Sequence, residues 1–454
     1  MAQAKRILTK YIETVMRESR FNMKFPPKGY YDQLLSSIVL PPMAGIEVTY
    51  PSQHIQNVEA SVRSELLACP EIEKICQKTV AVAVGSRGLA NLTALVKTTV
   101  DVLREKGANV YIVPAMGSHG GATAEGQLRL LEHLGISEEA MGVPIRSEMK
   151  PTVIAHTDDG LPVYFDAWAA AADHTVTIAR VKPHTGFRGT YESGMVKMNV
   201  IGLGKQKGAD LCHTRGMDNM GENLEKIGKL SIENSNLLLS LCVLENAYDE
   251  TYMVKAVPKG KILAEEAKLL EAARSLMPAV PFRDLDLIIV DEIGKNITGA
   301  GMDPNIIQRF SSPNMPAQPF TKQIAVLDLT DESDGNVNGV GFADVSTKRL
   351  YGKIDAEKAY TNALTARVVT PVKLPIIMEN DLTAIKAALK LASTTDSRHM
   401  RIVRIRNTLS LGRMEISEAL LEEAQHMSNI RVLTSAVPYA FDDCGNLPKC
   451  GFLY

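Results

Sequence analysis

Three of the nine histidines of this chain stand in segments where side chains could meet and do chemistry. His119 lies among small residues in the segment Met116–Gly121, His184 follows Pro183, and His213 comes after a stretch that carries several lysines. An imidazole changes its charge near neutral pH and binds transition metals in its neutral form, so each ring can serve as an acid, a base or a ligand. A histidine taken alone is more often structural or solvent-exposed. These three matter because we expect them to share one edge of one sheet.

Three cationic side chains stand in comparable places. Lys197 lies in the largely apolar run Met195–Val200, and burial of a lysine favours its neutral, nucleophilic form. Arg87 lies in the turn Gly85–Gly88, where its guanidinium could bind a carboxylate with two hydrogen bonds. Lys295 lies in a glycine-rich segment of the second half of the chain. For each lysine the alternative is a side chain that simply reaches solvent.

Two short glycine-bearing segments could surround an anion. Their candidate residues are Gly85, Ser86, Gly117, Gly120 and Gly121. Glycine lets backbone N–H groups approach a phosphate, and the start of a following helix adds a positive end. Neither segment is a Walker A loop or a dinucleotide fingerprint. Tight turns between strand and helix would explain the glycines equally well.

The elements that must position these residues follow from short apolar, β-branched runs alternating with helical spacing. This alternation predicts a parallel sheet with helices on its faces, in which ligands collect at the carboxyl ends of strands. The first 75 residues are expected to be irregular apart from one helix over 55–67. The expected strands are 79–84, 109–113, 175–181, 236–244 and 252–257, and the expected helices are 89–105, 123–134 and 260–276.

The alternation restarts after the segment Met277–Pro281, whose two prolines predict a linker. We therefore predict the α/β class, with two α/β domains whose mainly parallel sheets face a central cleft. Residues 1–281 would form a cofactor-binding domain and residues 282–430 a second domain, with the tail 431–454 packing back on the first. The elements expected in the second domain are strands at 285–290, 323–328 and 402–405, an extended stretch from Val368, and helices at 356–364, 381–391 and 417–425.

Composition limits the class of protein. The chain has 454 residues, which is too long for one core, and its 50 basic and 52 acidic side chains give a net charge of -2. Without a basic excess we expect no nucleic-acid partner. Six cysteines without a C-x-x-C pair do not indicate a disulfide framework. No apolar run suits a signal peptide or a membrane span, so a cytoplasmic protein is expected.

The order and spacing of four of these residues resemble the nickel-dependent lactate racemase family of 2-hydroxy-acid racemases and epimerases. His184 follows His119 by 65 residues, Lys197 comes 13 later, and His213 a further 16. Arg87 also falls where the family places an arginine. The resemblance spans roughly residues 75–310.

The resemblance implies an isomerase that inverts the hydroxyl-bearing carbon of a small 2-hydroxy acid by hydride transfer to and from a nickel pincer nucleotide. Lys197 would tether this cofactor covalently and His213 would bind the nickel. His119 and His184 would be the two acid–base groups, with Arg87 and Lys295 holding the substrate anion. Gly85, Ser86, Gly117, Gly120 and Gly121 would line the cofactor. The chemistry is reasonable, because the hydrogen on such a carbon is not acidic enough for plain proton abstraction, and one base is needed for each enantiomer.

This chain departs from the family pattern in two places. Val84 stands where the family has an acidic residue three places before the arginine, and the segment around Lys197 is bulkier than a pair of glycines. Two other readings therefore stay open. One is a zinc or iron hydrolase or lyase with the three histidines as ligands, and the other is a non-catalytic nucleotide-binding homologue. Partners would be the hydroxy acid and the proteins that assemble the cofactor. The sequence does not identify the acid or the oligomeric state.

Overall fold

The computed structural model describes residues 23–214, 216, 219–312, 315, 321–392, 396–449 and 452–454. The chain divides into two compact units. The middle unit comprises residues 51–277 with the short segment 312–315. The terminal unit comprises the described residues up to 50, residues 278–311 and the described residues from 321 onward.

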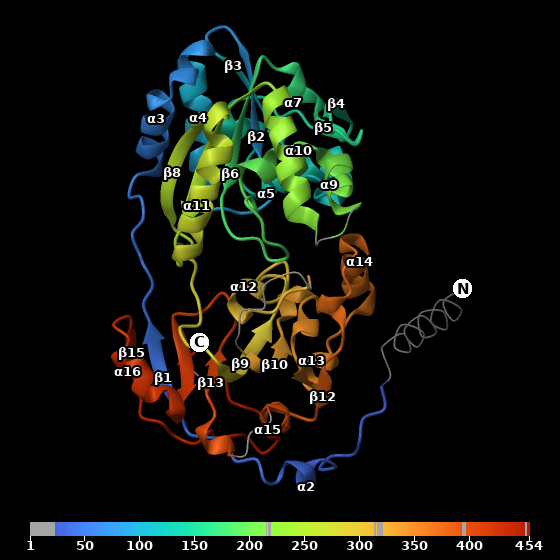
Figure 1. Ribbon diagram of the computed structural model, residues 1–454, viewed down its shortest axis with the longest axis vertical. Coiled ribbons are helices and arrows are strands. Elements are labelled where there is room, and N and C mark those ends of the chain that lie inside the picture. Colours follow the sequence, from blue (N-terminus) through green and yellow to red (C-terminus); the bar gives the residue numbers. More distant parts are fainter. Residues whose placement is uncertain are drawn as a thin grey trace, which may run out of the picture. The chain divides into compact units, whose positions relative to one another are not determined.

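The middle unit is built on a sheet of five strands, four of which run parallel (Figure 1). Each neighbouring pair is parallel except the last, in which the edge strand runs antiparallel to its neighbour. A separate hairpin joins β4 (Pro151–His156) to β5 (Pro162–Asp166). The strands of the main sheet, in spatial order, are β3 (Asn109–Pro114), β2 (Thr79–Val84), β6 (His174–Arg180), β7 (Leu237–Glu245) and β8 (Thr251–Pro258).

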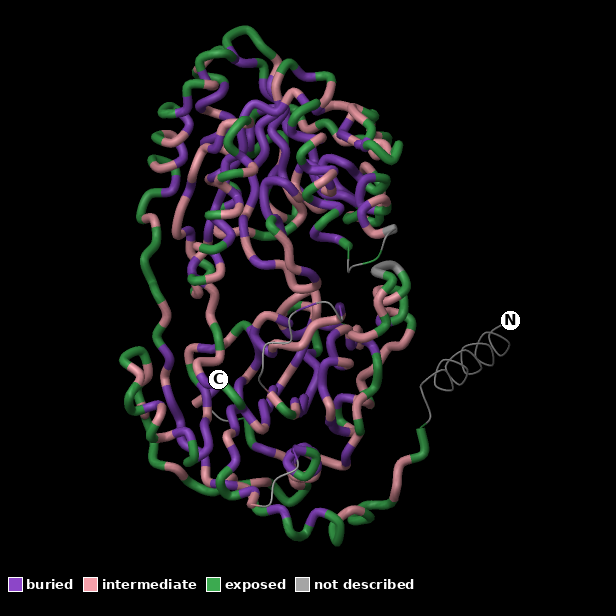
Figure 2. The backbone as a smooth tube through the Cα atoms, in the orientation of Figure 1, coloured by how far each residue is buried: buried purple, intermediate pink, exposed green. Residues whose placement is uncertain are grey.

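Strand β2 shows why these residues form the centre of the sheet. Its alternate residues Val80, Val82 and Val84 belong to a core shared with α3 (Val58–Ala68) and α4 (Leu92–Glu105). Ala81 and Ala83, on the opposite face, pack in a second core with α7 (Ala167–Ala171). A strand that is covered on both faces has an unbroken run of apolar residues, and the sequence of β2 is such a run. Figure 2 shows the strands of this sheet as buried.

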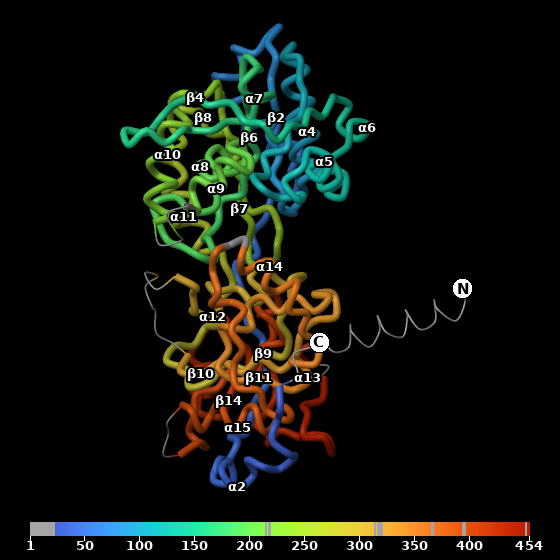
Figure 3. The backbone as a smooth tube through the Cα atoms, turned by 90° about the vertical axis from the view of Figure 1, so that its right-hand side faces the viewer, coloured from blue at the N-terminus to red at the C-terminus, as the bar shows by residue number. Residues whose placement is uncertain are grey.

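Helices cover both faces of this sheet. Figure 3 shows α4 and α5 on one side of the strands, with α8, α9, α10 and α11 on the other. Helix α5 begins with a cap, because the Thr123 hydroxyl accepts the N–H of Gly126 at 3.0 Å. The remaining helices of this unit are α5 (Ala124–His133), α6 (Glu138–Met141), α8 (Met195–Lys197), α9 (Lys205–Thr214), α10 (Met220–Asn234) and α11 (Ile262–Leu276).

The terminal unit contains a mixed sheet of eight strands. Its first five strands in spatial order are mutually parallel, and the last three pair antiparallel. The strands are β12 (Ile376–Met378), β11 (Val345–Thr347), β10 (Thr321–Leu329), β9 (Leu285–Ile293), β13 (Ile402–Ile405), β14 (Arg413–Ser417), β1 (Met43–Val48) and β15 (Ile430–Val432). Its helices are α2 (Asp32–Leu35), α12 (Pro304–Ile307), α13 (Lys348–Tyr351), α14 (Ala356–Ala366), α15 (Asp381–Leu391) and α16 (Leu421–His426).

The predicted α/β class with two mainly parallel sheets is confirmed. The division of the chain differs from the predicted boundaries at both ends. Strand β1 pairs with β14 and β15, so the first described residues belong with the terminal unit. The tail belongs there too: Met43 bridges to Val437, and a Cβ at Gly45 would lie 2.9 Å from the ring of Phe452.

Some predicted elements were wrong. The chain near Val368 is not extended, because residues Thr370–Val372 form a 3-10 turn and the next strand is β12. Helix α16 begins later than predicted, since Ser417 still pairs within β14. The cysteines of the described part of the chain are free thiols, and no helix found there has the length and apolar character of a membrane span.

Candidate active site

Three loops of the middle unit leave the sheet at one edge. Val84 of β2 lies opposite Pro114 of β3 and Ile178 of β6, so the loops after these parallel strands emerge together. The N–H of Ala115 donates to the carbonyl of Val84 at 2.8 Å, which ties the first two loops at their start. The sequence predicted that His119, His184 and His213 would share this edge, and it placed Arg87 in the loop after the first strand.

The loop after β3 carries His119, and the loop after β2 contacts it. The His119 Nδ1 is hydrogen-bonded to the hydroxyl of Ser86, so Nε2 is the ring nitrogen that can exchange a proton with a ligand. Although the His119 side chain keeps much solvent exposure, desolvation by neighbouring atoms and, to a smaller extent, the positive charges of Arg87 and Lys197 together lower its pKa to about 4. Arg87, His119 and Lys197 therefore lie near one another.

The glycines of this loop are explained mainly by backbone conformation and packing. Gly117, Gly120 and Gly121 have φ values of 57°, 68° and 66°, in the region that favours glycine. A Cβ at Gly120 would lie 2.6 Å from the backbone of Gly126, and one at Gly117 would lie 3.2 Å from Ile201. Only beside Gly121 does the space around an added Cβ stay open to 4 Å. The other two are required without any ligand.

Gly85 and the residue before it, Val84, also pack against other parts of the protein. A Cβ at Gly85 would lie 3.0 Å from the methyl carbon of Met198, so this glycine lets the segment after Lys197 pack closely. Val84, where the resembling family has an acid, is fully buried in the core with α3 and α4. No acidic ligand contact comes from that position.

The loop after β6 is held by a buried carboxylate. Glu192 Oε2 accepts the backbone N–H of His184 at 2.6 Å, and Arg188 lies 3.4 Å from the same oxygen. Its other oxygen accepts from Arg274 at 2.6 Å. The N–H of Lys182 donates to Ser193 at 2.9 Å and closes the loop. A buried charge needs this kind of pairing, so the loop that carries His184 is fixed at its base.

The ring of His184 is half-buried and has one nitrogen already engaged. The N–H of Gly186 donates to His184 Nδ1 at 3.0 Å, so the neutral ring carries its proton on Nε2. Burial lowers the pKa of His184 well below its usual value, and the charges of Lys197, Lys182, His213 and Arg188 add to this. In this conformation the ring is a hydrogen-bond donor at Nε2. It can accept a proton there only if Gly186 releases Nδ1.

Lys197 ends the short helix α8 and is half-buried. Burial, together with the charges of Arg87 and Lys182, lowers its pKa to about 8. A sizeable fraction of this amine is therefore neutral near pH 8. The chain continues as a π-helical turn, Met198–Gly202, a conformation that is rare and often found at functional sites.

Glu266 of α11 lies under the start of α8. Its Oε2 accepts the N–H of Val196 at 2.8 Å, and a Cβ at Gly194 would lie 2.4 Å from Oε1, so the glycine admits the carboxyl group. Burial raises the pKa of Glu266 to about 8, opposed by the hydrogen bonds from Val196 and Met195. At neutral pH this acid is largely protonated.

Glu266→Gln should therefore change how stability depends on pH. The folded protein holds a proton on Glu266 that the unfolded chain releases, so the free energy of unfolding falls as pH rises from about 4.5 to about 8. A glutamine keeps the size and loses the proton, so this part of the slope should disappear. Urea unfolding at several pH values measures it.

The matched control is Glu265→Gln, one residue earlier. Hydrogen bonds from Lys255 and Lys268 lower the pKa of Glu265 to about 2, so its contribution is constant above about pH 4.5. If the Glu266→Gln variant and the parent differ by the same amount across that pH range, Glu266 does not titrate as described.

His213 lies near the end of α9, directly after the buried Cys212. It is close enough to His184 for its charge to lower the pKa of that ring. Cys212 in turn lies near Lys197, whose charge partly offsets the effect of burial on the thiol. The predicted tether, the predicted nickel ligand and His184 thus belong to one cluster.

Further positive charge surrounds the site. Desolvation lowers the pKa of Arg87, and so does the nearby charge of Arg180, although the Arg87 side chain is largely exposed. Arg180 forms an ion pair with Glu245, which also accepts the N–H of Ala90 at 2.6 Å. Arg87 thus lies in a locally positive environment that suits an anionic ligand.

Comparison with solved structures gives the following matches. The structure is similar to that of a lactate racemase apoprotein. That protein is from Thermoanaerobacterium thermosaccharolyticum; the match has 14% sequence identity, a TM-score of 0.46, and covers 80% of this chain and 93% of the other. A Thermotoga maritima protein solved by a structural genomics consortium matches with 14% identity and a TM-score of 0.42, over 60% of this chain and 70% of its own. No family model and no curated protein matches the sequence.

Lys295 belongs to the terminal unit, apart from the residues above. Its Nζ donates to the carbonyl of Gly299 at 2.8 Å and lies 3.2 Å from Asn362 Oδ1, and its backbone N–H donates to Ser333. Its predicted role with substrate stays a prediction.

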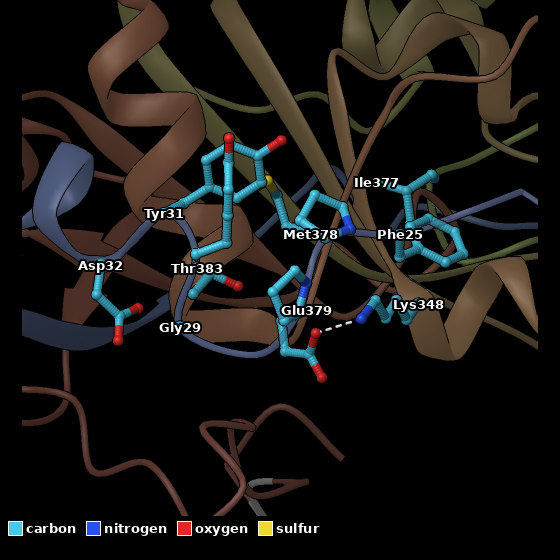
Figure 4. A pocket seen from close by; sticks show the side chains of 12 residues that line it. Phe25, Gly29, Tyr31, Asp32, Lys348, Ile377, Met378, Glu379 and Thr383 are labelled. Atoms are coloured by element: carbon cyan, nitrogen blue, oxygen red, sulfur yellow. Dashed lines mark hydrogen bonds and ion pairs between the residues drawn. The ribbon is translucent and has the colours of Figure 1, made fainter.

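The terminal unit also contains a small cavity of about 20 Å³ (Figure 4). Phe25, Tyr31 and Met378 line it, beside an ion pair of Lys348 with Glu379. Such a volume holds about one water molecule, so the cavity does not accommodate a hydroxy acid.

Sequence patterns did not indicate several residues that shape the candidate site. Lys182, Arg188 and Glu192 lie in the predicted loop, but nothing in their spacing singled them out. Glu266 lies within a predicted helix as one of two adjacent glutamates. The one usable signal was its position on the apolar face of α11, since an acid there must be buried.

Proposed function

We propose that this chain is a racemase or epimerase of a small 2-hydroxy acid that works with a nickel pincer nucleotide. The observation that carries the proposal is the meeting of Lys197 with Arg87, His119 and His184 at one edge of one sheet. A half-buried lysine with a lowered pKa near two histidines is unusual for a purely structural cluster.

The residues present suit such a cofactor. Lys197 supplies an amine that is readily neutral, as a covalent tether requires. His213 supplies an imidazole, a suitable ligand for nickel. Lys182 and Arg87 supply positive charge for a nucleotide phosphate and a substrate carboxylate. When bound, the cofactor would accept a hydride from the hydroxyl-bearing carbon and return it to either face.

The side chains of this chain would handle the carboxylate and the protons. Arg87 would bind the substrate carboxylate. His119, neutral at pH 7 and hydrogen-bonded to Ser86 through Nδ1, would accept the hydroxyl proton at Nε2. His184 would exchange a proton on the other side. For that step Gly186 must release Nδ1, so the loop that carries His184 has to rearrange during turnover.

The alternative of a three-histidine metal site has less support. Within the described part of the chain, which includes all three histidines, no group of three or more His, Cys, Asp or Glu side chains is arranged to hold a metal ion. A single histidine ligand beside a lysine tether does not need such a group. A binding protein without catalysis would need neither His119 nor His184.

The test uses protein purified from cells that assemble the cofactor. Single enantiomers of several 2-hydroxy acids, deuterated at the hydroxyl-bearing carbon, are supplied, and products are separated by chiral chromatography. We expect one or more acids to be inverted with the deuterium retained. Inversion with exchange of deuterium into water would indicate proton abstraction. No inversion of any acid by loaded protein would contradict the proposal.

A further inference from the structure

We propose that Gln127, Lys205 and Asp166 form a positioning network that holds the loop of His119 against the segment that follows Lys197. The inference rests on the proposed function for its catalytic meaning, although the network itself is a matter of contacts. None of the three residues reaches the sheet edge as an acid, base or ligand.

Lys205 is the centre of this network. It has no exposed surface, and its Nζ lies 2.8 Å from Asp166 Oδ2, which is equally buried. The same nitrogen donates to the carbonyl of Pro114 at 2.6 Å, at the end of strand β3. Lys205 takes a left-handed φ of 56°, which is unfavourable for a residue with a side chain. This unfavourable backbone conformation occurs at the residue whose amine contacts the end of β3, directly before the loop of His119.

Gln127 of α5 carries the contact from Lys205 to the loop. Its Oε1 accepts from Lys205 Nζ at 3.2 Å. Its Nε2 donates to the carbonyls of Gly117 and His119, at 3.0 and 3.3 Å. One fully buried amide therefore fixes two backbone groups of the loop, including that of the proposed base.

A second link joins the loop to the segment after Lys197. The N–H of Gly117 donates to the carbonyl of Gly202, the last residue of the π-helical turn, at 3.1 Å. A Cβ at Gly202 would lie 2.8 Å from the carbonyl of Ala115, so only glycine allows this approach. The loop of His119 and the segment between Lys197 and Lys205 are thus joined by a backbone hydrogen bond and a close approach of their backbones.

Stability alone is a weak reason for this arrangement. The desolvation of a buried ion pair offsets much of its attraction, and apolar side chains of similar size often replace such a pair without loss. What the polar network adds is direction, because three of its hydrogen bonds end on the backbone carbonyls of Pro114, Gly117 and His119. Fixed carbonyls fix the Cα of His119, and with it the distance from its ring to Ser86, Arg87 and Lys197.

The experiment is a histidine titration by NMR on apoprotein labelled with ¹³C-histidine, with the His119 signal assigned from His119→Gln. Gln127→Met keeps the side-chain shape and removes both hydrogen-bonding groups. We expect the pKa of His119 to move from about 4 toward 6.5, because the ring leaves its desolvated place beside Arg87 and Lys197. In loaded protein, kcat should fall by about 10²-fold with a smaller change in KM.

The control is Gln206→Met, the same change at an exposed position next to Lys205. It should leave the titration of His119 unchanged. If Gln127→Met fails to fold, the double variant Lys205→Met with Asp166→Asn removes both charges together and keeps the cap on α7. A folded Gln127 or double variant in which His119 titrates as in the parent overturns the inference. Because the titration needs neither cofactor nor substrate, it stands even if no racemase activity is found.

Discussion

Lys197→Ala is expected to abolish both the covalent attachment of the nucleotide and the inversion of any 2-hydroxy acid. The parent, made in cells that assemble the cofactor, should be heavier than its sequence by one mononucleotide-sized adduct. The adduct should map to the peptide that contains Lys197. The physical reason is the ease with which this amine loses its proton, since burial and the charges of Arg87 and Lys182 lower its pKa to about 8.

Lys207→Ala is the matched control. Lys207 lies ten residues later in the sequence, is exposed, and has its amine 5.8 Å from the centre of the Tyr164 ring. Its loss should change neither the adduct nor the activity. Intact-mass spectrometry with peptide mapping makes the comparison, and elemental analysis for nickel accompanies it. An adduct that persists in Lys197→Ala, or parent protein that is fully active without adduct and nickel, would contradict the assignment.

His213→Ala separates the two predicted contacts to the cofactor. The variant should lose nickel more readily than it loses the adduct, because the tether remains. The opposite order would mean that the metal is held elsewhere. The position of His213 near His184 makes it a candidate ligand, while the tether itself depends on Lys197 alone.

The sequence predicted the strands of the main sheet of the middle unit well because their signal is local, whereas the hairpin of β4 and β5 was not predicted. Strand β2 occupies the predicted residues, and β3, β6, β7 and β8 differ from prediction by a residue or so at each end. A strand buried on both faces is a run of apolar, β-branched residues that stands out from its neighbours. Because these strands were predicted to be parallel, the loops that carry Arg87, His119 and His184 were expected at one edge of the sheet.

Strand β1 escaped prediction because its stability comes from distant partners. Met43–Val48 contains a glycine and follows two prolines, which weakens its local signal. It forms because Ala44 lies opposite Ile416 and Ile46 opposite Val432, nearly the length of the chain away. Pairing of this range cannot be read from a window of the sequence. The membership of residues 23–50 in the terminal unit depends on it.

The candidate site residues could be proposed from the sequence, whereas the residues that support them could not. Histidines in polar loops and a lysine in an apolar run are visible in a sequence, whereas Gln127 looks like any polar residue of a helix. The contact of Gly186 with His184 was equally hidden, because it depends on a turn of three residues. That contact decides which nitrogen of His184 carries the proton.

The two histidines should both be required, yet differ in pH dependence. His119→Gln or His184→Gln is expected to lower the rate of inversion by about 10²–10⁴-fold while nickel stays bound. If both act in one reaction sequence, the double variant should lose little more than either single variant. His133→Gln, at an exposed position of α5, is the control.

The acidic limb of the dependence of kcat/KM on pH then tests which histidine is the base. A base works when deprotonated, so activity falls as pH drops through its pKa in the free enzyme. For His119 this limb should lie near pH 4, far below the ordinary histidine value of 6.5, because desolvation and the charges of Arg87 and Lys197 favour the neutral ring. Circular dichroism at each pH separates loss of activity from unfolding. A limb near pH 6.5 in folded, loaded protein would remove His119 as the base and point to a histidine outside the positive cluster.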